Sequence, residues 1–166
     1  MGDGWIEFKV MGIVVDPKAS NPVVVLIDLA GQKALPIWIG VFEAEAISRG
    51  LEDAVTLRPM THDLMKQVLD TFHASLARVV IHDLKDNTFF ANLHLDVDGR
   101  EMVVDSRPSD AIALAVRVKA PIFVTESVIE ATKHLGLFAS KLLEGQDELK
   151  TIIENMKPED FGKYKM

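Results

Sequence analysis

The first part of the chain alternates between apolar and polar positions in three runs that predict β-strands. Residues 6–15, 23–29 and 34–39 are rich in β-branched and aromatic side chains, and turn-forming residues separate them. Pro36 in the third run favours an edge strand or a bulge, because proline cannot donate a hydrogen bond to a strand ladder.

Apolar residues then recur at helical spacing. We expect a helix over residues 43–53, a short extended piece over 55–58, and a second helix from Thr61 to about residue 74. Thr61 is the expected N-cap of that second helix, because its hydroxyl suits the free backbone N–H groups of a first turn. The apolar positions of the second helix form one stripe: Leu64, Met65, Val68, Leu69 and Phe72.

The same order of elements is expected again in the second part of the chain. Asp98-Gly99 marks a tight hairpin, and Pro108 marks the start of a helix whose residues 111–118 are apolar nearly all round and therefore buried. The strands are expected over residues 79–84, 88–95, 101–105 and 121–124, and a last helix over 126–135.

A shift of 65 residues superimposes Glu45-Ala46-Ile47 on Asp110-Ala111-Ile112, and the predicted elements with them. We therefore predict an α+β fold made of two pseudo-repeated β-β-β-α-β-α units, about 5–74 and 76–135, that share one core. The short connections favour a mostly antiparallel or mixed sheet with packed helices. The domain is expected to span residues 5–135, followed by a C-terminal part, 136–166, with a helix near 147–156 and an irregular tail.

Composition narrows the functional classes. The chain of 166 residues is 48% hydrophobic and contains no cysteine, which excludes a thiol nucleophile and a thiolate zinc site. The net charge of −7 argues against a general nucleic-acid binder, which usually carries a basic patch. It does not exclude a nuclease, because bound divalent cations reverse the local field. We find no secretory signal and no apolar run that could span a bilayer, and we expect a cytoplasmic protein without membrane contact.

Four polar segments next to apolar elements hold the candidate chemistry. Each has a plain structural explanation, since acids and hydroxyls cap helix starts and Asp-Asn forms turns. Each also has a functional one: carboxylates bind divalent cations, histidine transfers protons, and an arginine at a helix start suits a phosphodiester. The residues are Glu45; His62 and Asp63; Lys85 and Asp86; and Arg107, Ser109 and Asp110.

Together these segments resemble the signatures of the bifunctional nuclease domain family. The resemblance runs in order from about residue 8 to residue 130. It is carried by residues 35–40 with 43–47, by 58–64, by 82–90 and by 105–115. The resemblance implies a small α+β fold, a homo-oligomer, and nuclease action on DNA and RNA. The short C-terminal part does not resemble the helical-hairpin motif that some relatives carry.

Our hypothesis is that the chain hydrolyses phosphodiester bonds of DNA and RNA with little base specificity, assisted by Mg²⁺ or Mn²⁺. His62 is the candidate base, with Asp63 and Asp110 beside it. Glu45 and Asp86 are candidate metal ligands, to which Asp63 and Asp110 can add. Arg107, Lys85 and Ser109 are the candidate substrate-binding residues. The alternative is a non-enzymatic oligomeric module in which the same residues cap helices and bridge subunits.

Overall fold

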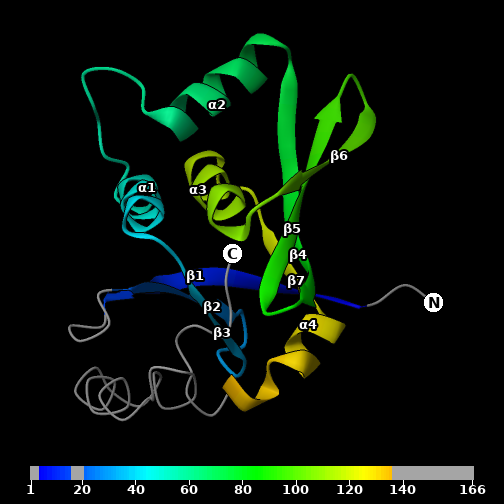
Figure 1. Cartoon of the computed structure of the whole chain (residues 1–166). Coiled ribbons are helices and arrows are strands. Elements are labelled where there is room, and N and C mark those ends of the chain that lie inside the picture. The colour runs from blue at the N-terminus through cyan, green and yellow to red at the C-terminus, as the bar shows by residue number, and fades with distance from the viewer. Residues whose placement is uncertain (1–3, 16–20, 136–166) are drawn as a thin grey trace.

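The computed structural model describes residues 4–15 and 21–135, and within them one seven-stranded mixed sheet with helices packed against it (Figure 1). The predicted α+β class is confirmed. The strands are β1 (Trp5–Val15), β2 (Pro22–Asp28), β3 (Ala34–Trp38), β4 (Ala74–Lys85), β5 (Thr88–Val97), β6 (Arg100–Ser106) and β7 (Ile122–Thr125). The helices are α1 (Val41–Leu51), α2 (Thr61–Thr71), α3 (Pro108–Val118) and α4 (Glu126–Ala131).

Two antiparallel meanders, β1-β2-β3 and β4-β5-β6, are joined through β7. The strand order is β3-β2-β1-β7-β4-β5-β6, with β7 antiparallel to β1 and parallel to β4. Pro36 lies on the edge strand β3, as expected. The β5–β6 turn has positive φ at both Asp98 (54°) and Gly99 (77°), which is the geometry that favours Asp-Gly in a two-residue hairpin.

The second half of the chain follows the expected order, whereas the first half does not in full. Residues 55–58 form no strand, and Val55 and Leu57 are fully exposed. An extended segment needs a free strand edge beside it, and β7 fills the place next to β1 that such a strand would need. The expected strand between the two helices therefore forms only in the second half, and the internal duplication stays a prediction.

The prediction of Thr61 as the N-cap of α2 is also wrong. Met60 is the N-cap, and Thr61 is the first helical residue. The free N–H of Met60 donates to Oδ2 of Asp63 at 2.9 Å, so an acid three residues into the helix satisfies a backbone donor at the helix start.

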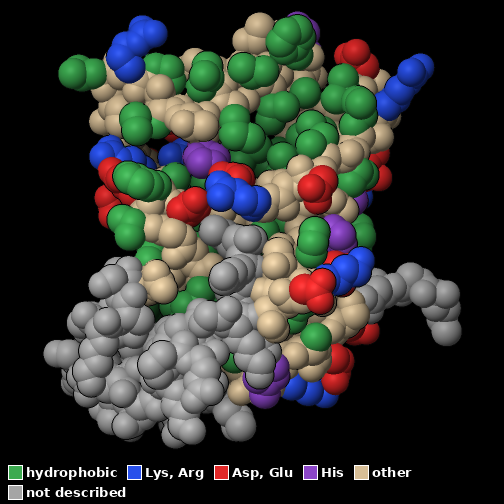
Figure 2. Space-filling view, viewed as in Figure 1, with side chains coloured by type: hydrophobic (Ala, Val, Ile, Leu, Met, Phe, Trp, Pro, Cys, Tyr) green, Lys and Arg blue, Asp and Glu red, His purple; other side chains and the backbone are tan. Residues whose placement is uncertain are grey.

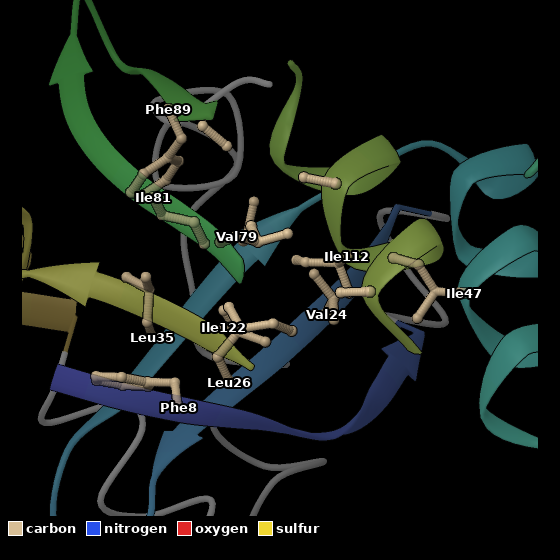
Figure 3. Packing of buried hydrophobic residues seen from close by; sticks show 14 of the residues in the cluster. Phe8, Val24, Leu26, Leu35, Ile47, Val79, Ile81, Phe89, Ile112 and Ile122 are labelled. Atoms are coloured by element: carbon tan, nitrogen blue, oxygen red, sulfur yellow. The ribbon is translucent and has the colours of Figure 1, made fainter. Parts of the chain in front are cut away.

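The core lies between the sheet and helices α1 and α3. Helix α3 is buried from Ala111 to Ala115, which confirms the expectation of a buried helix. Figure 3 shows Ile112 of α3 and Ile47 of α1 directed toward Val24 of β2, with Val79 of β4 nearby. Because α1 and α3 are anchored on the same core, their N-terminal turns are held in fixed positions.

In Figure 1, α1, α2 and α3 lie on one side of β1 and α4 lies on the other. The helix predicted near 147–156 and the tail lie outside the described residues. No helix in the described ranges is long and apolar enough to cross a membrane.

Candidate functional site

A cavity of about 340 Å³ opens where the first turns of α1, α2 and α3 approach one another. It is lined by Glu43 of α1, by His62 at the start of α2, and by Arg107 and Asp110 at the start of α3. Figure 2 shows histidine, basic and acidic side chains gathered at mid-height on this face, below the hydrophobic side chains that cover α2.

His62 and Asp110, 48 residues apart in the sequence, meet in this cavity. Nε2 of His62 lies 3.0 Å from Oδ1 of Asp110, and the histidine is only 8% exposed. Burial alone would raise the pKa of Asp110, but hydrogen bonds from Arg107 and His62 outweigh it and hold that pKa below its ordinary value of 3.8. An ionised carboxylate only accepts hydrogen bonds, so Nε2 of His62 carries the proton. In the neutral ring, the lone pair then lies on Nδ1.

Arg107 joins Asp110 to α1. Its Nε donates to Oδ2 of Asp110 at 2.7 Å, and its Nη1 donates to Oε1 of Glu43 at 3.1 Å. These bonds raise the pKa of Arg107, the hydrogen bond to Asp110 most of all. The arginine is the N-cap of α3, and its side chain runs along the first turn toward Asp110. Among the described residues, no acceptor is bonded to Nη2 of Arg107, which leaves two N–H donors for a ligand.

Asp63 is held by the fold on both carboxylate oxygens. Oδ1 accepts from Nε of Arg117 at 2.7 Å, and Oδ2 accepts from the N–H of Met60. The bond from Arg117 is the main reason that the pKa of Asp63 is below its ordinary value. Nη1 of Arg117 also donates to the carbonyl oxygens of Ala46 and Ala113, so this arginine ties together α1, α2 and α3. Asp63 thus fixes the start of α2, where His62 lies.

The candidate metal ligands do not converge. Glu45 lines the cavity, but its Oε1 accepts two hydrogen bonds from Arg49, at 3.0 and 2.8 Å. Asp86 lies in the β4–β5 turn with φ of 49° and lines no part of the cavity. Within the described ranges, no three histidine, aspartate or glutamate side chains are grouped to hold a metal ion. The donor set as arranged here does not fit a divalent cation, and the cation stays a prediction.

Two of the three candidate substrate-binding residues lie away from the cavity. Lys85, at the end of β4, pairs with Asp83 at 2.7 Å. Ser109 is 1% exposed, and its buried Oγ has no hydrogen-bond partner among the described residues. Only Arg107 is exposed to the cavity, so the structure brings together His62, Asp110 and Arg107, with Glu45 and Asp63 beside them.

Sequence reasoning missed three residues of this site. Glu43, rather than its neighbour Glu45, reaches Arg107, and Arg117 had no role assigned. Phe42 lines the cavity yet is 83% exposed. The available signals were an arginine inside an otherwise apolar helix for Arg117 and an aromatic residue outside the apolar stripe of its helix for Phe42.

Comparisons with known proteins give this arrangement a family. The chain is 37% identical over 158 residues to an uncharacterized protein of Mycobacterium tuberculosis, which is found in two strains. The aligned region covers 95% of this chain and 92% of that protein. It is 28% identical over 118 residues to Bifunctional nuclease 2 of Oryza sativa subsp. japonica, which covers 69% of this chain and 36% of that protein. The family model of the bifunctional nuclease domain matches residues 24–135, a range that contains every candidate site residue, and the chain belongs to this family.

Proposed function

We propose that the chain is a nuclease that hydrolyses phosphodiester bonds of DNA and RNA in the cavity between α1, α2 and α3. The observation that carries the proposal is the continuous arrangement of His62, Asp110 and Arg107 around one opening. Hydrolysis of a phosphodiester requires a group that accepts a proton from water and a positive charge that binds the phosphate. His62 can supply the first and the guanidinium of Arg107 the second. Family membership and the rice relative's name support the same activity.

The geometry assigns distinct roles. Asp110 keeps the proton on Nε2 of His62, so Nδ1 can take a proton from an attacking water. The hydroxide oxygen bonds to phosphorus, the bond from phosphorus to the leaving oxygen breaks, and the imidazolium can return the proton to that oxygen. Nη2 of Arg107 donates to a phosphate oxygen, where negative charge grows in the transition state. Asp63 acts through Arg117 and Met60 as a positioning residue.

The divalent cation is tested with the activity. Highly purified protein is given labelled single-stranded DNA and RNA with Mg²⁺, Mn²⁺ or EDTA. The variants His62→Gln and Arg107→Gln are compared with His73→Asn and Lys85→Gln, whose parent side chains lie outside the cavity. His73→Asn is a suitable control because asparagine tolerates the positive φ of 56° at that position.

We expect His62→Gln to lower kcat by about 100-fold or more, since general base catalysis contributes that much. Arg107→Gln should lower kcat/KM, and both controls should cleave like wild type. For Asp110, a positioning role predicts that Asp110→Asn lowers kcat with little change in KM, because the amide no longer holds the proton on Nε2 of His62. An unchanged kcat would contradict that role.

Two results would overturn the proposal. Equal cleavage by all variants would place the activity elsewhere or in a contaminant. No cleavage by the wild type under any cation condition would favour the non-enzymatic module, for which the capping and pairing of Asp63 is the specific observation.

The homo-oligomer is retained as part of the proposal. Leu64 and Val68 on the outer face of α2 and Phe72 at its C-cap are exposed, and apolar side chains grouped in this way are the surface that a second copy would cover. Sedimentation velocity over a range of protein concentrations measures it, and a monomer throughout would contradict it.

A further inference from the structure

The cavity has an aromatic wall that the hydrolysis just described does not use. Phe42 lies in the first turn of α1 and is 83% exposed. The buried stripe of this helix is Ala44, Ile47 and Gly50, so Phe42 points away from the core. A phenylalanine side chain left in water gains none of the free energy that burial of its apolar surface would give. The side chain is therefore placed where it can contact a ligand or a partner.

The neighbours of Phe42 favour a nucleotide as that ligand. Arg49 is seven residues further along α1, on the same face of the helix, and lines the same cavity. It uses Nε and Nη2 on Glu45, and among the described residues no acceptor is bonded to its Nη1. Arg107 presents its own unbonded Nη2 across the opening. An exposed aromatic ring beside two arginines with spare donors combines a stacking surface for a base with contacts for phosphates.

We infer that Phe42 is the stacking surface for a nucleobase next to the cleaved phosphate, and that the substrate is therefore unpaired, single-stranded nucleic acid. The inference rests on the proposed function. A base inside a duplex has both faces covered by its neighbours and cannot stack on Phe42 without leaving the helix. Every base has a face that can stack, so this contact selects for strandedness and not for sequence. The volume of about 340 Å³ is at the small end of ligand sites, which suits one nucleotide unit.

The test measures binding apart from cleavage. His62→Gln protein, which should leave the strand intact, is titrated into a fluorescein-labelled single-stranded oligonucleotide, and anisotropy is followed. The same titration is made with Phe42→Ala, Phe42→Tyr and Leu57→Ala in that background, with a duplex of the same length, and with a strand in which the bases are replaced by abasic sites. Leu57 is the control, since it is also an exposed apolar side chain but lies outside the cavity lining.

We expect Phe42→Ala to weaken single-strand binding by about 5- to 150-fold, the range found when a base-stacking aromatic is removed. Phe42→Tyr should bind within about threefold of the His62→Gln protein because it keeps the ring, and Leu57→Ala should bind as the His62→Gln protein does. The His62→Gln protein should bind the abasic strand and the duplex weakly. Adding Phe42→Ala should not weaken binding to the abasic strand any further. That last comparison separates stacking on a base from a general loss of surface.

Three outcomes would overturn the inference. The first is unchanged binding by Phe42→Ala, and the second is an equal loss of binding to the abasic and the normal strand. The third is a changed sedimentation coefficient of Phe42→Ala, which would make Phe42 a protein contact. The proposed function fails separately. If wild-type protein does not cleave but binds single strands through Phe42, the nuclease is wrong and the binding site stands.

Discussion

At the scale of single residues, Asp63 shows how one carboxylate supports a site without facing it. It accepts hydrogen bonds from Arg117 and from the N–H of Met60, and the side chain of Arg117 is only 7% exposed. Asp63→Asn leaves that buried guanidinium without its charged partner and weakens the cap of α2. We expect the free energy of unfolding to fall by about 2 kcal/mol, measured by urea denaturation.

Glu45→Gln is the matched control, because it also removes a carboxylate that pairs with an arginine. Both Glu45 and Arg49 are exposed, so the loss should be about 0.5 kcal/mol or less. Equal effects of the two substitutions would contradict a supporting role for Asp63.

The Asp63 effect also has a defined pH dependence. Its pKa is lowered on folding, mainly by the bond from Arg117, so its carboxylate stabilises the protein above the ordinary pKa of 3.8. That stabilisation is lost as the pH falls through the lower pKa of the folded state. The difference between wild type and Asp63→Asn should therefore be full at pH 7 and shrink below about pH 4. A difference that grows toward acid pH would have the wrong sign.

At the scale of elements, helices α1 and α3 pack so closely that a glycine is required between them. A Cβ on Gly50 would lie 2.5 Å from Cγ2 of Val116 and 2.7 Å from Nη1 of Arg117. Glycine to alanine inside a helix ordinarily stabilises by about 0.5–1 kcal/mol. At this position we expect Gly50→Ala to destabilise by about 1–3 kcal/mol, since the helices must separate. Displacement of Arg117 should also lower cleavage.

Gly12→Ala is the control, because no atom of another described residue lies within 4 Å of the added methyl group. Urea denaturation should place this variant within about 0.5 kcal/mol of wild type. A stabilised Gly50→Ala would show that α1 and α3 are less tightly packed than described.

The elements also show what local pattern can and cannot predict. Alternation and helical spacing predicted nearly every strand and helix, and Asp98-Gly99 predicted its hairpin, because these signals depend on neighbouring residues. The insertion of β7 between β1 and β4 and the absence of a strand at 55–58 depend on which edges meet in space. Residue type selected all the site candidates, and it could not show which of them meet. His62, Asp110 and Arg107 lie around one cavity, whereas Lys85 and Asp86 lie away from it.

At the scale of the whole molecule, the charge opposes the proposed substrate. A net charge of −7 repels a polyanion at long range, whereas Arg49 and Arg107 attract phosphates locally. Salt screens both, with a Debye length of about 8 Å at physiological ionic strength. Most nucleic-acid binders lose affinity steeply with salt because each neutralised phosphate releases counterions.

Two arginine contacts to a single strand correspond to a slope of log K against log salt of about −1.4, and screening of the overall repulsion makes the slope shallower still. We expect a value between about 0 and −1.4, measured by anisotropy of His62→Gln protein with a single-stranded oligonucleotide from low to physiological salt. Arg107→Gln should bring the slope about 0.7 closer to zero, and Lys85→Gln should leave it unchanged. A slope steeper than about −4 would mean that the strand contacts a much more basic surface than this cavity. The two-arginine description of the site would then be wrong, whatever the protein cleaves.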